Sequence, residues 1–280
     1  MVTTSVELEQ LIDGTVNIPT IPTILVEITA IFDSPDGSAK DAARIIEKDP
    51  AIATRALRLV NSSFYGLKNP VSNINLACSI LGLKVIKNLA IQATVLQTFG
   101  ANQERGEFNT DWLWDHSFKS AVACRLLAEH SVITNDFNPD DAYTCGLIHD
   151  IGRLIMIDSQ SDRFFEALKL SKQNNIPLAT AEAKVFGFNH AHVGGLLANR
   201  WKLAPNVQAA VMSHHSPPTK LNGWKHGFLV RAASTYAHMA AGSNSAWIGD
   251  FINEDGRKTL GLTQTQHEEI LKATAEASMD

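Results

Sequence analysis

The sequence has little of what marks several common protein classes. Its three cysteines, Cys78, Cys124 and Cys145, are odd in number and widely spaced, which excludes a disulfide framework and a cysteine-based zinc motif. No uncharged apolar stretch approaches the ~18 residues of a membrane span. The start of the chain, residues 1–7, lacks the basic and apolar segments of a signal peptide. We therefore expect a protein of the reducing cytosol, with no membrane contact.

The chain also lacks an excess of positive charge. It has 24 lysines and arginines against 29 acidic residues, a formal net charge of −5, which argues against a broad basic face for nucleic acid. Neither a Gly-x-Gly-x-x-Gly or phosphate loop nor a Gly-x-Ser-x-Gly elbow is present. A nucleic-acid partner, a nucleotide-binding loop and a serine hydrolase site are therefore not expected.

What the sequence does contain is helical periodicity along nearly its whole length. In residues 22–32 the apolar side chains recur every three to four positions, as one face of a helix requires. The alternating pattern of strands is missing. We predict an all-α fold.

A polar stretch at residues 100–107 is the best boundary between the parts of the chain. It predicts an N-terminal helical subdomain over residues 1–105 and a second helical subdomain over 106–245. Residues 246–280 are then a mostly polar C-terminal tail with one amphipathic helix near 263–275.

All ten histidines follow residue 115, which suggests that the two parts have different roles. The most informative of them is His149, which precedes Asp150 at the expected end of a helix opened by Asn138 and Pro139. Gly152 is then a plausible stop signal for that helix. An imidazole beside a carboxylate is a donor pair that can hold a divalent cation.

Further histidines lie at helix positions that should face inward, as in the metal sites of helical bundles. His116 shares a face with small and apolar residues, while His190 and His192 cannot share a face. The alternative is a set of hydrogen-bonded core histidines without metal. Glu182 and Arg153 are isolated charges nearby, for which a surface or capping role is the simplest interpretation.

Residues 146–153 resemble the core motif of the HD superfamily of metal-dependent phosphohydrolases. The wider chain, from about residue 17 to 242, resembles the HDOD domain, a largely non-catalytic branch related to the HD-GYP cyclic-di-GMP phosphodiesterases. The blocks that carry this resemblance are residues 18–22, 49–50, 57–66, 77–82, 192–197, 201–205 and 214–215.

The resemblance implies an HD-domain-like helical bundle, with the HD-like subdomain over residues 106–245 and an additional N-terminal helical subdomain. It also implies a set of site residues. The implied ligands of a divalent metal (Fe, Mn, Ni, Zn or Mg) are His116, His149, Asp150, His192, His214 and His215. Asp150 and Arg153 are the implied catalytic residues. Two departures stand out: Ser234 occupies the best register for the final acid, and Ser216-Pro217-Pro218 replaces the Gly-Tyr-Pro signature.

Two functions follow from the resemblance. The first is an HDOD-type regulatory module of bacterial signal transduction that acts on a protein partner and keeps part of the metal site. The second is a metal-dependent phosphohydrolase acting on a phosphomonoester or a nucleotide second messenger. The serine at position 234 and the missing Gly-Tyr-Pro favour the first, and the retained histidines favour the second.

Overall fold

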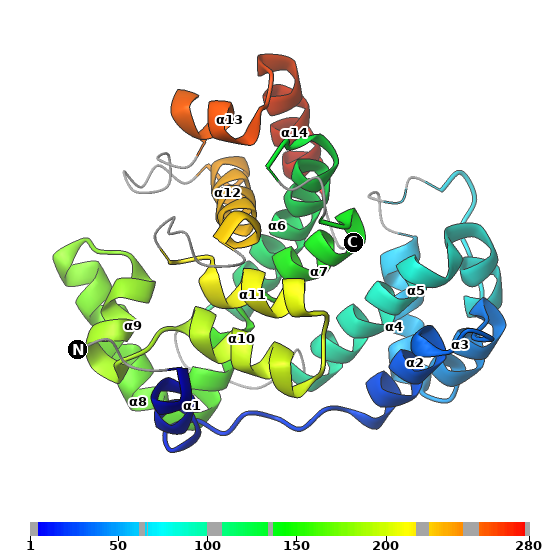
Figure 1. Ribbon diagram of the computed structural model, residues 1–280, viewed down its shortest axis with the longest axis horizontal. Helices are drawn as coiled ribbons and strands as arrows, with labels where there is room; N and C mark the ends of the chain where they lie inside the picture. The colour runs from blue at the N-terminus through cyan, green and yellow to red at the C-terminus, as the bar shows by residue number, and fades with distance from the viewer. Residues whose placement is uncertain are drawn as a thin grey trace.

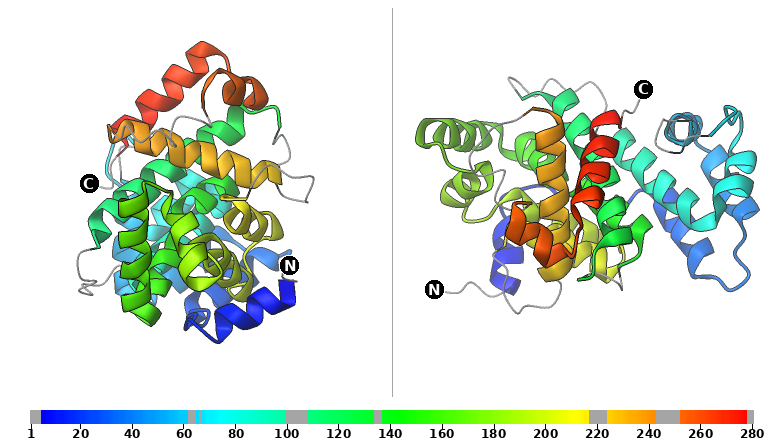
Figure 2. Two further views of the ribbon diagram at one scale, coloured as in Figure 1. Left: turned by 90° about the vertical axis from the view of Figure 1, so that its left-hand side faces the viewer. Right: turned by 90° about the horizontal axis from the view of Figure 1, so that it is seen from above.

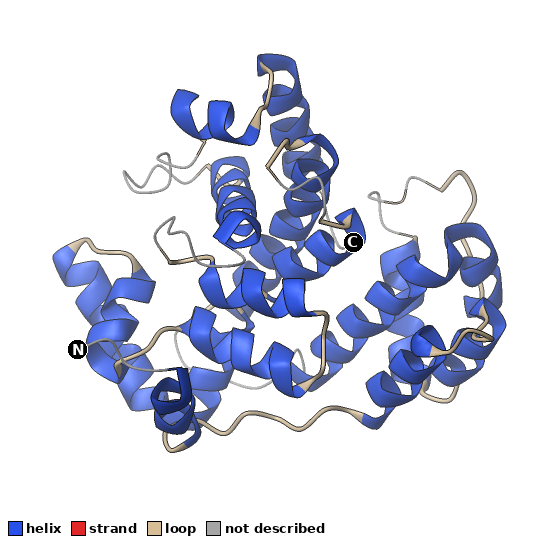
Figure 3. Ribbon diagram, in the orientation of Figure 1, coloured by secondary structure: helices blue, strands red, loops and turns tan. Residues whose placement is uncertain are grey.

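The computed structural model of the chain contains only helices and connecting loops in the part that it describes (Figures 1 and 3). That part comprises residues 5–61, 65, 67–99, 108–133, 137–216, 224–242 and 252–277. No strand occurs in these residues, which confirms the predicted all-α class. Within the same residues, no helix has both the length and the apolar character needed to cross a bilayer.

Fourteen helices are described, in the following order. They are α1 (Ser5–Asp13), α2 (Thr23–Asp33), α3 (Ala39–Glu47), α4 (Pro50–Val60), α5 (Ile74–Phe99), α6 (Thr110–His130), α7 (Pro139–Ile148), α8 (Ile151–Asn174), α9 (Leu178–Phe186), α10 (His190–Arg200), α11 (Pro205–Ser213), α12 (Trp224–Ala240), α13 (Glu254–Leu260) and α14 (Gln264–Glu276).

Several helices begin where the sequence predicts, because a side chain satisfies the free N–H groups of the first turn. Asp49 accepts from two N–H groups of α4 and Pro50 follows it. Asn138 caps α7 ahead of Pro139, and Asn189 caps α10. The caps at Asn138 and Asn189 fix the starts of α7 and α10, the helices next to His149 and His190.

Helices α2 to α5 form one group, at the right in Figure 1. Within it α5 packs on α3 and α4, and its later part reaches α7. Gly82 interrupts α5 with φ 78° and ψ 168°, a conformation that suits glycine, at the break predicted between residues 81 and 83. The boundary predicted at residues 100–107 lies outside the described residues.

The first helix lies apart from that group, beside α8 and α10 (Figures 1 and 2). The backbone N–H of Asn17 donates to Ser159 Oγ at 2.9 Å, and the indole N–H of Trp201 donates to the carbonyl of Pro19 at 3.1 Å. The segment assigned to an N-terminal subdomain therefore starts against the C-terminal half and crosses over to α2.

The C-terminal helices cover the central pair of helices. α14 packs against α6 and α12, and the Tyr236 hydroxyl lies 2.7 Å from Nδ1 of His267 in this buried contact. The helix predicted near residues 263–275 is thus part of the core, and it supports the two helices that carry His116 and Ser234.

Candidate metal centre

The His149-Asp150 pair forms the junction between two helices. His149 is the C-cap residue that follows α7, and Asp150, at φ −97° and ψ 2°, precedes α8. The turn between them lets both side chains point into the same buried region. Both are about 1% exposed, as expected for groups that meet partners inside the protein rather than water.

The prediction that Gly152 ends a helix is wrong, since α8 begins at Ile151 and includes Gly152. The reason for a glycine there is close packing. A Cβ atom on Gly152 would lie 2.1 Å from the carbonyl oxygen of His190. The missing side chain therefore lets α8 approach α10 and brings Asp150 next to His190.

One side of the Asp150 carboxylate faces His116 and His149, and we call these three residues the His116 cluster. Asp150 Oδ2 lies 3.9 Å from Nε2 of His116 and 3.5 Å from Nε2 of His149. These residues were predicted to lie together, and they do so with His116 on α6 and the other two at the α7–α8 junction. All three are buried, and one donor atom of each lies within 4.8 Å of the other two.

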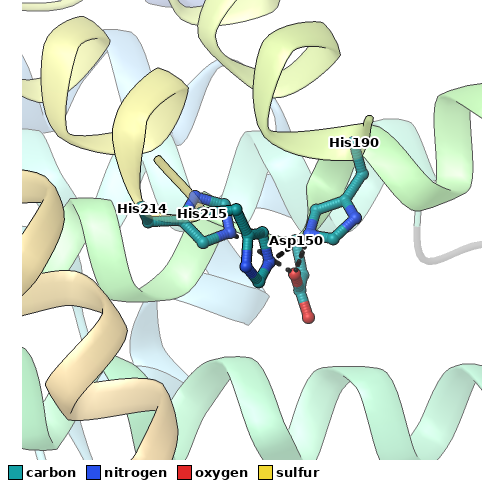
Figure 4. Close-up of side chains that lie close together, drawn as sticks. All are labelled: Asp150, His190, His214 and His215. Carbon is teal, nitrogen blue, oxygen red and sulfur yellow. Dashed lines mark hydrogen bonds and ion pairs between the residues drawn. The ribbon is translucent and has the colours of Figure 1, made fainter. Parts of the chain in front are cut away.

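The other carboxylate oxygen faces a second group, the His190 cluster. It consists of Asp150, His190, His214 and His215 (Figure 4). Asp150 Oδ1 lies 2.9 Å from Nε2 of His190 and 4.0 Å from Nε2 of His214. The His215 Nε2 atom lies 3.0 Å from His190 Nε2. One carboxylate is thus shared by two sets of imidazoles.

His190 stands where the resemblance places His192, and we correct that assignment. The two residues are two positions apart in the first turn of α10, so their side chains point in nearly opposite directions. The Nδ1 atom of His192 instead accepts the backbone N–H of Asn189 as part of the helix cap. His192 therefore belongs to neither cluster.

Of the surface or capping role considered for Glu182, the surface role is wrong and the contact with the start of α10 is of the capping kind. Its side chain is fully buried, and Glu182 Oε2 lies 2.6 Å from Nδ1 of His190 and accepts the backbone N–H of His190 at 2.9 Å. A carboxylate behind an imidazole fixes the orientation of the ring and makes the facing nitrogen a better ligand. Glu182 is therefore a positioning residue for His190.

We expect Glu182→Gln to lower the affinity of the site for divalent metal by about 10- to 100-fold, as is usual when a partner behind a histidine ligand is lost. Glutamine keeps the size of the side chain and removes its charge. Titration of the metal-free protein with Zn²⁺ measures the effect, and Glu166→Gln on the exposed face of α8 is the control. Equal affinities in both variants would show that Glu182 does not act on the site.

Two other imidazoles are oriented by backbone carbonyls. Nδ1 of His149 lies 2.7 Å from the carbonyl oxygen of Gly146, and Nδ1 of His214 lies 2.6 Å from that of Val211. Because a carbonyl oxygen can only accept, both Nδ1 atoms carry the proton and both Nε2 atoms offer a lone pair. Each Nε2 atom is buried and has no hydrogen-bond partner among the described residues.

The protonation states of His149, His214 and Asp150 match the needs of a cation. Burial lowers the pKa of the His149 and His214 rings, so both are neutral at pH 7. Burial opposes ionisation of Asp150, but the nearby Arg153 and the histidines outweigh it and hold the pKa of the carboxyl well below its usual range. At His190 burial is outweighed by the carboxylates of Glu182 and Asp150, which raise the pKa of that ring. Neutral imidazoles beside an ionised carboxylate, as at His149 and His214, are donors that metal ions take in proteins.

Arg153 lies at the edge of the clusters. Its guanidinium contacts Asp150 Oδ2 at 2.9 Å, and the side chain is 12% exposed. It also lines a cavity of about 410 Å³ that reaches His215 and Ser234. The simple surface role considered for Arg153 does not describe this position, which joins the buried carboxylate to the cavity.

Ser234 lies beside the His116 cluster, since its hydroxyl is 3.2 Å from Nε2 of His116. The sequence did not point to His238, one turn further along α12. Its ring centroid is 4.4 Å from that of His116, and burial lowers its pKa to about 4. His238 follows Ser234 by four residues, a spacing that puts both side chains on one face of a helix, and this spacing was the available signal for His238.

The comparisons with known proteins agree with this architecture. Residues 18–217 match the HDOD domain family. A relative from Treponema pallidum (strain Nichols), described as an uncharacterized protein, is 27% identical over 209 residues, which is 72% of this chain and 38% of the relative. The chain therefore spans less than half the length of this curated relative.

Three solved structures have the same fold. An HDOD domain protein of unknown function from Geobacter sulfurreducens is 23% identical, with a TM-score of 0.75 over 95% of both chains. A Shewanella amazonensis protein provisionally assigned as a phosphohydrolase is 22% identical, with a TM-score of 0.70 over 98% of this chain and 99% of that one. A Marinobacter aquaeolei protein provisionally assigned to signal transduction is 19% identical, with a TM-score of 0.77 over 96% of this chain and 63% of that one.

The family match covers most of the chain, and the all-helical fold with its buried His-Asp pair is consistent with it. The chain belongs to the HDOD domain family.

Proposed function

We propose that this chain is a regulatory module of signal transduction that binds divalent metal and acts on a protein partner. One observation carries the metal part. Three imidazoles, of His149, His190 and His214, are each held through Nδ1 and turn Nε2 toward the single carboxylate of Asp150. Without a cation, the buried Nε2 lone pairs of His149 and His214 have no partner among the described residues, which is costly inside a protein.

The donor set limits the identity of the metal. Imidazole nitrogen dominates both clusters, and imidazole suits iron, nickel and zinc better than magnesium, which prefers oxygen. Asp150 offers one oxygen to each cluster. The residues that would hold metal are thus His116, His149 and Asp150 on one side and Asp150, His190, His214 and His215 on the other.

Two features support a regulatory role over an enzymatic one. The position beside His116 that would complete the metal site with an acid holds the hydroxyl of Ser234. The Marinobacter structure carries a description in signal transduction, and the Treponema relative is much longer than this chain, as expected for a module that works within a larger protein. The cytosolic location and the protein partner expected from the sequence belong to this proposal.

A metal-dependent phosphohydrolase is the second candidate, because a specific observation favours it. The cavity that opens beside both clusters is lined by three cationic side chains, of Arg153, Lys172 and Arg231. A bound metal would supply Lewis-acid chemistry and an activated water. In this chain Arg153 is placed to bind a phosphoester oxygen, and Ser234 and His215 line the passage to the clusters.

Turnover assays of the metal-loaded protein distinguish the two candidates. We expect no measurable hydrolysis of a cyclic dinucleotide and at most slow hydrolysis of p-nitrophenyl phosphate with added Mn²⁺ or Ni²⁺. Fast hydrolysis of a cyclic dinucleotide by the unmodified protein, lost in His149→Ala, would replace the regulatory proposal with the enzymatic one.

Restoring the missing acid should strengthen the site. We expect Ser234→Asp to raise the affinity for Mn²⁺ or Zn²⁺ at least about tenfold, which corresponds to ~1.4 kcal/mol, because an ionised oxygen is a much better ligand than a hydroxyl. Calorimetric titration checks the result, with Ser234→Asn as a control of similar size and no charge. An affinity that rises equally in both variants would contradict the assignment of position 234.

A further inference from the structure

The cavity beside the clusters, which we call the Trp112 cavity, has a one-sided charge. Its wall contains the cations Arg153, Lys172 and Arg231 and the imidazoles of His215 and His238. Among the described residues that line it, none is a carboxylate. In a chain with a net charge of −5, such a concentration of positive groups marks a site for an anion.

The positive groups include an unused donor. One nitrogen of the Arg153 guanidinium lies 2.9 Å from Asp150 Oδ2. Its Nε atom is buried and has no hydrogen-bond partner in the part of the chain that is described. Because Arg153 lines the cavity, a phosphate ester oxygen there can approach its guanidinium, whose planar set of donors matches the geometry of phosphate.

The rest of the wall is apolar and contains a flat aromatic surface. Phe108, Leu168, Pro177 and Leu178 line it together with Trp112. The Trp112 ring is stacked on His116, with centroids 5.0 Å apart and an interplanar angle of 8°, and it keeps 37% of its surface exposed. One face of the indole is therefore held in place by the buried histidine, which leaves the ring suited to stack against a planar group in the cavity.

The volume limits the size of the ligand. About 410 Å³ lies at the lower end of the ~300–1,000 Å³ range of small-molecule sites. One planar ring system with a sugar and a phosphate is of that scale. A cyclic dinucleotide, with two bases and two phosphates, is roughly twice as large.

We infer that the Trp112 cavity binds a mononucleotide-type phosphate ester, with the phosphate at Arg153 and Lys172 and the planar base against Trp112. This inference deepens the proposed function by naming the ligand class of the same site. It rests on the proposed function only for the regulatory effect that binding would have. The binding itself depends on the cavity and its charges, which the chain forms.

Calorimetric titration with 5′-AMP tests the inference, in protein treated with EDTA and in protein loaded with Zn²⁺. Inorganic phosphate, adenosine and a cyclic dinucleotide are titrated in parallel. We expect 5′-AMP to bind more tightly than each of these three. Phosphate or adenosine binding as tightly as 5′-AMP, or a cyclic dinucleotide binding more tightly, would overturn the inference.

Three variants locate the ligand. Loss of one base-aromatic stack costs about 5- to 100-fold in affinity, so Trp112→Leu should weaken 5′-AMP by that factor and leave inorganic phosphate unchanged. Trp112→Phe should restore most of the loss, and Trp224→Leu, outside the cavity lining, is the matched control. Lys172→Gln should weaken phosphate and 5′-AMP alike. Unchanged 5′-AMP binding in Trp112→Leu would refute the stacking role.

The failure of this inference can be told apart from the failure of the proposed function. Metal binding without 5′-AMP binding would remove the ligand assignment and leave the metal-binding module intact. Binding of 5′-AMP in the EDTA-treated protein, with no metal bound under any condition, would support the cavity and remove the metal centre.

Discussion

Asp150→Asn is expected to reduce metal affinity by at least about 100-fold, the largest effect of any single substitution in the site. The carboxylate is the one group shared by both clusters, with one oxygen facing His149 and the other facing His190. Its replacement by a neutral amide removes the only anionic ligand of either set, and buried cations need a compensating charge. Titration with Zn²⁺ and Mn²⁺ measures the change.

Asp162→Asn, on the exposed face of α8, is the matched control and should bind metal as the unmodified protein does. The half-buried side chain of Arg153 loses its 2.9 Å partner in Asp150→Asn, so far-UV circular dichroism must first establish that this variant is folded. A folded Asp150→Asn protein with undiminished metal affinity would contradict the shared role of the carboxylate.

Gly152→Ala is expected to destabilise the fold and the site together. The added Cβ would lie 2.1 Å from the carbonyl oxygen of His190, and the obstacle is backbone that cannot rotate away. Overpacking of this kind costs ~1–3 kcal/mol and occasionally more. The helices α8 and α10 must separate to relieve it, which moves Asp150 away from His190. We therefore expect a free energy of unfolding lower by about 3 kcal/mol and a parallel loss of metal affinity.

Urea denaturation followed by circular dichroism measures the stability. Gly14→Ala serves as the control, because its Cβ would meet its nearest neighbour at an ordinary 3.4 Å. A Gly152→Ala protein as stable as the control, with full metal affinity, would show that the close approach of α8 and α10 does not position the site.

The sequence allowed much of the fold to be predicted, because helix caps and apolar periodicity are local signals. Asp49, Asn138 and Asn189 cap the helices as expected. The position of α1 could not be predicted in this way. It depends on contacts such as that of Asn17 with Ser159, residues that are 142 positions apart, and no local pattern encodes such a contact.

The site was predictable where the side chains belong to one motif or one helix face. His116, His149 and Asp150 lie together as the motif and the periodicity indicated. The prediction named His192 where the structure has His190. The physical reason is that the exact start of α10 decides which of the two faces inward. Glu182 was misread because a buried carboxylate is rare without a partner, and its partner, His190, was itself assigned to the wrong role.

Metal analysis of the protein purified without a histidine tag is the most direct test of the buried centre. We predict at least about one Fe, Ni, Zn or Mn ion per chain, retained through gel filtration and lost in His149→Ala and His190→Ala variants that remain folded. A folded protein that holds no metal, even after incubation with Zn²⁺, Mn²⁺, Ni²⁺ and Fe²⁺, would contradict this prediction and leave the clusters as a hydrogen-bonded histidine core.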